Sequence, residues 1–176
     1  MVAHATSADK SRRANLASLI VFGTAFGFVE AAVVYYLRAL IRFDSNYAIS
    51  SYKTWLNLGF ITFVSPKHPL LMSGHVSDVE VTRESATIVM LACVSFIAAR
   101  AWRARIGAFM VSFACWDLTY YVFLKILDNW PSSFFTRDVY FLIPVTWIGP
   151  VITPIVICTV MLILGIKLYL DPSTKT

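Results

Sequence analysis

Four long apolar runs constrain the fold of this sequence more than any other feature. They cover about residues 15–40, 84–102, 106–127 and 141–170. A helix needs roughly 20 apolar residues to cross a bilayer. Hydrophobic residues make up 58% of the 176-residue chain and charged residues only 14%, against about 25% charged in soluble domains. The sequence therefore predicts an all-α integral membrane protein, with residues 1–176 forming one domain built as an antiparallel bundle of four transmembrane helices.

Basic residues at the ends of these runs predict the orientation. They precede the first run, join the second to the third and follow the fourth: Lys10, Arg12, Arg13, Arg100, Arg103, Arg105, Lys167 and Lys175. Loops rich in Lys and Arg stay in the cytoplasm, so we expect both termini to be cytoplasmic, in a prokaryotic inner (plasma) membrane. Four basic residues on the other side reduce the contrast: Arg38, Arg42, Lys53 and Lys67. A net charge of +5 divided among such clusters fits contacts with lipid headgroups better than nucleic-acid binding.

The segment between the first two runs is expected to be an extracytoplasmic, amphipathic interfacial helix over about residues 44–63. Its apolar residues recur at helical spacing, and its Tyr52 and Trp55 suit the headgroup layer. The stretch NWPSSFFTRDVYFLIP is expected to lie in the interface as well. Its aromatic residues fit either an interfacial belt or a site for a quinone, lipid or pigment. Prolines 144, 150 and 154 predict a kinked start to the fourth span.

Three carboxylates lie inside the predicted spans. Glu30, Glu84 and Asp117 each fall in the outer half of the bilayer, counted at 1.5 Å per residue. In the first span, the GTAFG spacing of Gly23 and Gly27 favours close helix approach. Charged groups in a membrane normally face the bundle interior. We therefore predict one shared acidic pocket.

The predicted ligand-, proton- or cation-binding residues are those three carboxylates with two neighbours on the third span: Glu30, Glu84, Asp117, Tyr121 and Lys125. Clustered carboxylates bind a cation, or take up a proton when they lie close together. The alternative is structural: the acids pair with Lys125, Arg38 and Arg83 and fix the helices to one another. The sequence leaves both explanations open.

Catalytic and metal-binding patterns are scarce. The chain contains no HExxH, GxSxG or phosphate-binding glycine loop, and its helical runs lack the histidines of haem or di-iron sites. His68 and His75 form a weak candidate metal pair in the outer loop. Cys93, Cys115 and Cys158 lie in apolar runs with no redox or metal-ligand spacing. The sequence leaves the identity of any cofactor unknown, and a non-catalytic role is expected.

Two main functions remain after these exclusions. The first is a non-catalytic accessory subunit of a larger membrane complex. The second is an oligomeric transporter or channel-like protein that uses the acidic cluster as its proton or cation site. An intramembrane hydrolase or lipid-modifying enzyme is a further alternative. Four helices seldom enclose a whole transport path, so the expected partners are the lipid bilayer and either further copies of the chain or other membrane subunits.

Overall fold

Four long helices make up most of the protein. The computed structural model describes residues 2–41, 52–66 and 74–171. Within these ranges the helices are α1 (Val2–Ile41), α3 (Gly74–Ala98), α4 (Trp102–Asp128) and α5 (Ile152–Leu170). All four are long and apolar enough to cross a membrane. The predicted number of such helices is therefore confirmed.

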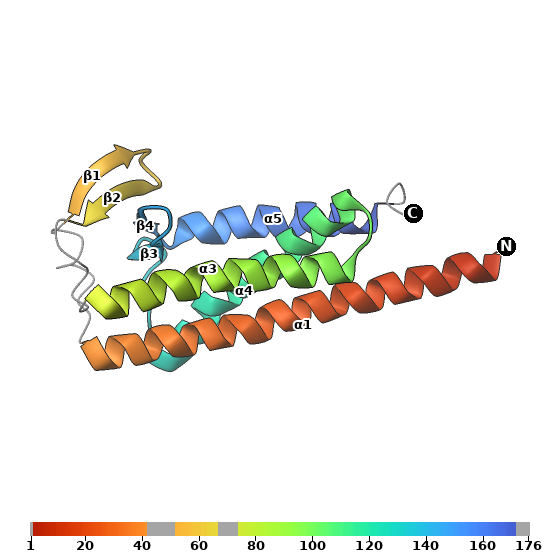
Figure 1. The fold of residues 1–176 in the computed structure, drawn as a ribbon, viewed down its shortest axis with the longest axis horizontal. Coiled ribbons are helices and arrows are strands. Elements are labelled where there is room, and N and C mark those ends of the chain that lie inside the picture. Colours follow the sequence, from red (N-terminus) through yellow and green to blue (C-terminus); the bar gives the residue numbers. More distant parts are fainter. Residues whose placement is uncertain (1, 42–51, 67–73, 172–176) are drawn as a thin grey trace.

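α4 is the helix against which the others pack. α1 and α5 lie along it over much of their length, and α3 packs on it less extensively (Figure 1). The buried positions in the first half of α4 carry mostly small side chains: Ala104, Gly107, Ala108, Ser112, Ala114 and Cys115. Small residues let helix backbones approach closely, which explains why α4 accommodates a neighbouring helix on two sides.

Glycines mark the points of closest approach. A Cβ atom added to Gly23 of α1 would lie 2.6 Å from the carbonyl oxygen of Ser112, and one added to Gly27 would lie 2.6 Å from that of Trp116. On the other side of α4, a Cβ atom on Gly107 would lie 2.6 Å from the backbone nitrogen of Tyr169 in α5. No side chain fits at such distances, so the predicted approach at Gly23 and Gly27 joins α1 to α4.

An apolar core fills the half of the bundle in which α1 begins and α5 ends. Its buried members are Leu19, Ala104, Ala108, Val111, Cys115 and Tyr169. At this end Arg12 of α1 donates hydrogen bonds to the carbonyl oxygens of Tyr169 and Asp171. The last carbonyls of a helix lack partners within the helix, and Arg12 supplies donors for those of α5.

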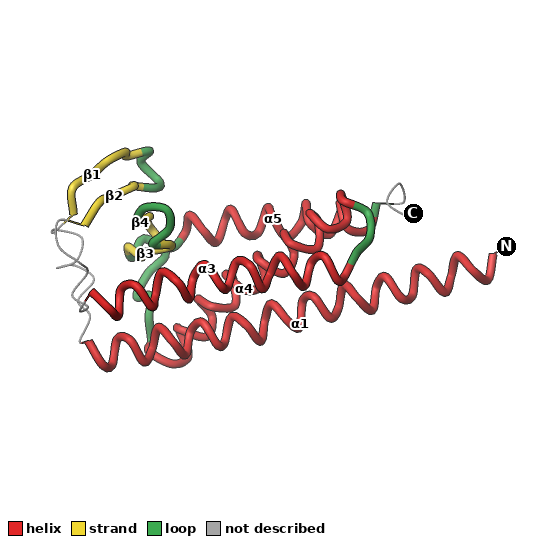
Figure 2. Tube along the Cα trace, in the orientation of Figure 1, coloured by secondary structure: helices red, strands yellow, loops and turns green. Residues whose placement is uncertain are grey.

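A small sheet lies at the opposite end of the helices, where α1 ends and α3 begins (Figures 1 and 2). Its strands are β1 (Tyr52–Asn57), β2 (Thr62–Pro66), β3 (Arg137–Phe141) and β4 (Thr146–Pro150), paired antiparallel in the order β1-β2-β4-β3. The pairing of β2 with β4 joins the segment before α3 to the segment before α5.

The interfacial helix predicted over residues 44–63 is wrong where the structure describes that range, because β1 and the start of β2 form a hairpin there. The side-chain oxygen of Asn57 accepts a hydrogen bond from the amide of Gly59 at 2.8 Å. Gly59 has a φ of 84°, a conformation that glycine adopts readily and that turns the chain. The register then pairs Leu56 with Phe63. Residues 44–51 lie outside the described ranges.

Three predicted span boundaries also need correction. α1 begins at Val2, 13 residues before the predicted start at about residue 15. α5 begins at Ile152 rather than near residue 141, because residues 146–150 form hydrogen bonds with strands on both sides. α3 begins at Gly74, ten residues before the predicted start. The predicted end of the third span is close to the observed one. There Asn129 adopts a left-handed conformation with φ of 51°, which ends α4.

Candidate functional site: an acidic cavity beside the sheet

A cavity of about 120 Å³ lies where α1, α3 and α4 meet β3. We call it the acidic cavity. Its charged lining residues are five carboxylates and two guanidiniums: Glu30, Glu80, Glu84, Asp117, Asp138, Arg38 and Arg83. Its aromatic lining residues are Trp116, Tyr120, Tyr121, Tyr140 and Phe141. The remaining wall is aliphatic: Val34, Leu37, Val139 and Leu142. With every acid ionised, the lining has three more negative than positive charges.

Arg83 neutralises part of this charge. Its guanidinium donates to Glu30 at 2.5 Å and 2.7 Å and to Glu80, on its own helix, at 2.6 Å and 3.0 Å. Two parallel hydrogen bonds to one carboxylate give a strong and directional pair. One arginine thus joins α3 to α1 and orients two acids.

Arg38 forms its ion pair with a carboxylate that does not line the cavity. It donates to Asp128 at 3.0 Å, and its guanidinium carbon lies 4.0 Å from the centre of the Trp130 ring. A cation at this distance from an indole ring is favourably placed. Arg38 therefore forms its ion pair with a carboxylate at the end of α4, and in the cavity wall its charge also acts on Asp138.

Glu84 and Asp117 have neutral partners only. Glu84 Oε2 accepts a hydrogen bond from the backbone amide of Leu142 at 2.9 Å. Asp117 Oδ2 accepts one from the thiol of Cys158 at 3.3 Å. In the part of the chain that the structure describes, the second oxygen of each carboxylate accepts no hydrogen bond from the protein. These two side chains bring acceptors without a balancing cation to the cavity wall.

Asp138 also faces the cavity with a neutral partner. Its Oδ2 accepts a hydrogen bond from the hydroxyl of Tyr121 at 2.9 Å. Burial raises the pKa of Asp138 to about 6, and the Tyr121 hydrogen bond opposes that rise. Burial likewise raises the pKa of Tyr140, whose hydroxyl donates to the carbonyl of Pro150 at 2.6 Å. Tyr140 therefore stays neutral and braces the turn into α5.

Trp116 contributes a buried polar group to the aromatic wall. Its side chain is only 5% exposed, and its indole N–H has no hydrogen-bond partner among the described residues. The ring contacts Phe26, Phe113 and Phe141, with ring centres 5.2 to 6.3 Å apart. These contacts pack the indole among three aromatic rings, one residue before Asp117 along α4.

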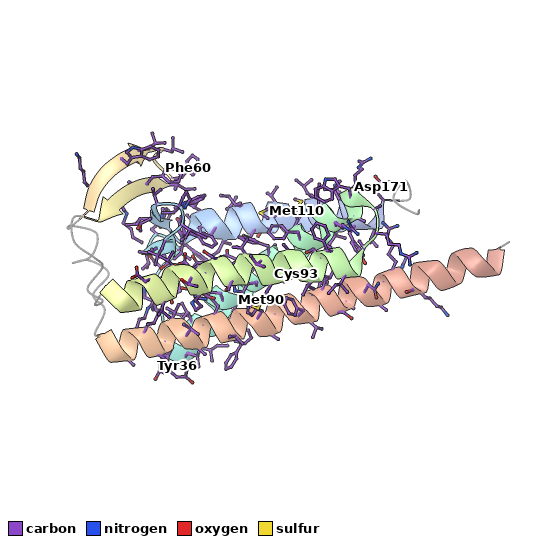
Figure 3. All side chains as sticks on the ribbon, viewed as in Figure 1. Tyr36, Phe60, Met90, Cys93, Met110 and Asp171 are labelled. Atoms are coloured by element: carbon purple, nitrogen blue, oxygen red, sulfur yellow. The ribbon has the colours of Figure 1, made fainter. Side chains whose placement is uncertain are left out.

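The acidic cavity is bounded by the apolar core on the side away from the sheet. Leu19 lies about 16 Å before Glu30 along α1, and Val111 lies about 9 Å before Asp117 along α4. Both are fully or almost fully buried in the bundle. Apolar side chains thus separate the acids of the cavity from the opposite end of the bundle. Tyr36 and Met90 lie on outer surfaces of the helices (Figure 3).

The structure brings four of the five predicted site residues together. Glu30, Glu84, Asp117 and Tyr121 all line the acidic cavity. Lys125 does not: it is exposed, and its ammonium donates to the carbonyls of Asn129 and Pro131 at 3.1 Å and 3.0 Å. It therefore contacts carbonyls just beyond the end of α4.

The weak histidine candidate cannot be assembled from the described residues. His68 lies outside the described ranges, and the structure describes only the backbone of His75, in α3. Within the described part of the chain, no three His, Cys, Asp or Glu side chains are grouped so that they could hold a metal ion.

Sequence reasoning missed Asp138 as a cavity residue. It was placed within an interfacial segment, and no charge pattern pointed to the bundle. The signal available was the alternation in RDVYF, since a strand puts residues 138 and 140 on one face. Arg83 is predicted only as a pairing partner of the acids; in the structure Arg83 and Glu80 line the same cavity as Glu30.

Fold and cavity together define a mainly helical protein with four helices long and apolar enough to cross a membrane and an acidic cavity near one end. No protein-family model matches the chain, and neither a curated protein nor a solved structure is significantly similar to it.

Proposed function

We propose that this chain is an integral membrane protein that binds a cation or a basic group in the acidic cavity, and that it serves as a non-catalytic subunit of a larger membrane complex. The observation that carries this proposal is the charge imbalance of the lining. Five carboxylates and two guanidiniums face one cavity, and one guanidinium is paired elsewhere. An uncompensated carboxylate inside a protein is costly, so it recruits a cation or a proton.

The proposed placement in the membrane follows from the two ends of the bundle. The four helices cross the bilayer antiparallel to one another, with both termini and the α3–α4 turn in the cytoplasm of a prokaryotic cell. Support comes from Arg12, Arg103 and Arg105, which lie at the end where α1 enters and α5 leaves the bundle. Clusters of basic residues mark the cytoplasmic side. The sheet and the acidic cavity then lie on the extracytoplasmic side.

The subunit role rests on the limited depth of the cavity. An apolar core closes the bundle on the cytoplasmic side of the acids, with Leu19, Ala108 and Val111 almost completely buried. A ligand that enters from the sheet side has no polar route onward through these side chains. Binding without passage suits a subunit that holds a ligand or group for a neighbouring protein.

A transporter is the second candidate, and one observation favours it. Asp117 and Glu84, on different helices, each lack a cationic partner among the described residues while facing the same cavity. Intramembrane carboxylates of this kind mark ion and proton routes in transporters. Transport by this chain would require the apolar core to open, or a route formed between several copies.

Two measurements test the proposal. Native mass spectrometry of the protein released gently from its membrane shows which chains it binds, and we expect other polypeptides at fixed stoichiometry. Thermal unfolding in lipid nanodiscs is then followed with Na⁺, K⁺, Mg²⁺, Ca²⁺ and small protonated amines. A cation should raise the midpoint of the wild-type protein and not that of Asp117→Asn. If no cation raises the unfolding midpoint, the binding role is overturned. A homo-oligomer with cation-dependent flux in liposomes would favour the transporter.

A further inference from the structure

We propose that the ligand of the acidic cavity is a small protonated amine, bound through the free oxygens of Glu84 and Asp117 against an aromatic wall. The inference rests on the proposed function, since it names the chemical class of the ligand for the same site. It is drawn from the acceptors, the aromatic rings, the free donor and the size of the cavity.

The acceptors are the first argument. Each of these two carboxylates uses one oxygen for a neutral donor of the protein, the Leu142 amide or the Cys158 thiol. An ammonium group donates up to three hydrogen bonds. Charge-assisted hydrogen bonds to carboxylates are roughly twice as strong as neutral ones. The two remaining oxygens therefore offer acceptors of opposite charge to an ammonium, which has a donor for each of them.

The aromatic wall is the second argument. Tyr120, Tyr121 and Phe141 line the same cavity as the two carboxylates. Ring faces attract organic cations, and aromatic residues are the usual surroundings of bound ammonium groups. A bare divalent metal ion instead needs several oxygen ligands converging on one point. Among the described residues, no three His, Cys, Asp or Glu side chains are grouped so that they could hold a metal ion.

The third argument is a donor that lacks a partner. Trp116 lines the cavity, is 5% exposed, and has an indole N–H without a hydrogen-bond partner among the described residues. A buried donor left unsatisfied is costly. The N–H is closed off in the structure, so a ligand that carries an oxygen next to its amine would supply the missing acceptor only once the Trp116 ring shifts towards the cavity.

Cavity size limits the group that enters. A protein cavity of about 150 Å³ holds a benzene molecule. The acidic cavity, at about 120 Å³, therefore accommodates a group of roughly five or six non-hydrogen atoms. The aliphatic wall formed by Val34, Leu37 and Val139 suits the carbon atoms of such a group. The ligand is thus a compact amine, or the amine headgroup of a larger molecule.

A matched pair of probes tests this inference. Piperidine is protonated at neutral pH, and tetrahydropyran is its neutral analogue with oxygen in place of nitrogen and the same ring size. Saturation-transfer NMR and thermal unfolding are measured on the full chain in nanodiscs with each probe. We expect binding and a raised unfolding midpoint with piperidine, and neither with tetrahydropyran. This comparison uses the wild-type protein alone, so it does not depend on any variant being folded.

Variants then locate the site. Asp117→Asn and Glu84→Gln keep the size of the side chain and remove its charge, and each should weaken piperidine binding about tenfold or more. Asp78→Asn removes an exposed carboxylate on α3 that does not line the cavity, and it should leave binding unchanged. An equal loss in all three variants would overturn the assignment.

The outcomes separate this inference from the proposed function. Equal binding of piperidine and tetrahydropyran would overturn the amine inference, because charge would then play no part. Stabilisation by an inorganic cation, with no effect of piperidine, would also overturn it while leaving a cation-binding subunit. Failure of every cation and amine to bind would overturn both.

Discussion

Arg83 of α3 binds both carboxylate oxygens of Glu30 of α1, at 2.5 Å and 2.7 Å, and joins two helices that otherwise contact each other little. The side chains are 25% and 12% exposed. Glu80 shares the same guanidinium. The glutamate that stands out in the apolar first run is therefore part of a three-residue ionic group, and the pair has structural as well as electrostatic consequences.

Arg83→Met should destabilise the protein strongly. The change removes the cation and leaves Glu30 and Glu80 facing each other without a balancing charge. Breaking a buried ion pair costs about 3–5 kcal/mol, and the partial exposure of this pair lowers the expected loss to about 2–3 kcal/mol. Thermal or denaturant unfolding in nanodiscs at neutral pH measures the loss.

The control for this prediction is Arg103→Met. Arg103 lies 3.5 Å from Asp171, and its side chain is 62% exposed, so its removal should cost less than about 1 kcal/mol. The double variant Arg83→Met with Glu30→Gln should recover part of the stability. Equal losses for Arg83→Met and Arg103→Met would show that the Arg83 group does not hold α3 in place.

Gly27→Ala should push α1 away from α4. Its new Cβ atom would lie 2.6 Å from the carbonyl oxygen of Trp116 and would overlap the hydroxyl of Thr119. Overpacking of this kind costs about 1–3 kcal/mol. Ala25→Val adds more atoms on an exposed face of α1 and should change stability by less than about 0.5 kcal/mol. The prediction fails if the two variants unfold at the same midpoint.

The helices were predictable from the sequence because each apolar run contains its own signal. Length and hydropathy locate a span without reference to any other segment, and the Gly23–Gly27 spacing points to a close contact along a single helix. Glu30, Glu84 and Asp117 were recognisable for the same reason, since a charge in an apolar run stands out locally.

The sheet was not predictable in this way, because its pairing joins distant segments. Phe63 of β2 lies opposite Trp147 of β4, and the local sequence of neither strand predicts this pairing. The spacing of apolar residues in 44–63 fits a helix, but the turn at Asn57 and Gly59 was the local signal against it. The error over the sheet also explains why Asp138 was missed, since only the β3–β4 pairing brings that carboxylate to the cavity.

Asp138 should make the stability of the protein depend on pH. Burial raises its pKa from the ordinary value of 3.8 to about 6 in the folded protein, so the folded state binds the proton more tightly than the unfolded state does. Stability from this group is therefore greatest below about pH 4 and falls as the pH rises towards 6. Above pH 6 the loss stays constant, at roughly 2–3 kcal/mol.

Asp138→Asn isolates this contribution. Asparagine keeps an oxygen that accepts the hydrogen bond from Tyr121 but does not ionise. The variant should be more stable than the wild type at pH 7 and nearly equal to it at pH 4, as measured by unfolding midpoints across that range. A constant difference between the two proteins from pH 4 to pH 7 would contradict the raised pKa.

Thr153→Val should loosen the β1–β2 hairpin without unfolding the helices. The hydroxyl of Thr153, in the first turn of α5, donates to the carbonyl of Phe60 at 3.1 Å, and Phe60 lies in the turn of the hairpin beside α5 (Figure 3). Loss of one such hydrogen bond costs about 1 kcal/mol. Opening of the hairpin should then become about fivefold more frequent, and amide hydrogen exchange in β1 and β2 should accelerate by that factor.

The matched control is Thr159→Val. Among the described residues, the hydroxyl of Thr159 bonds only to Ile155 of its own helix. Because that bond does not reach the hairpin, exchange in β1 and β2 should stay at the wild-type rate. Equal acceleration in both variants would mean that α5 as a whole, rather than the contact between Thr153 and Phe60, stabilises the hairpin.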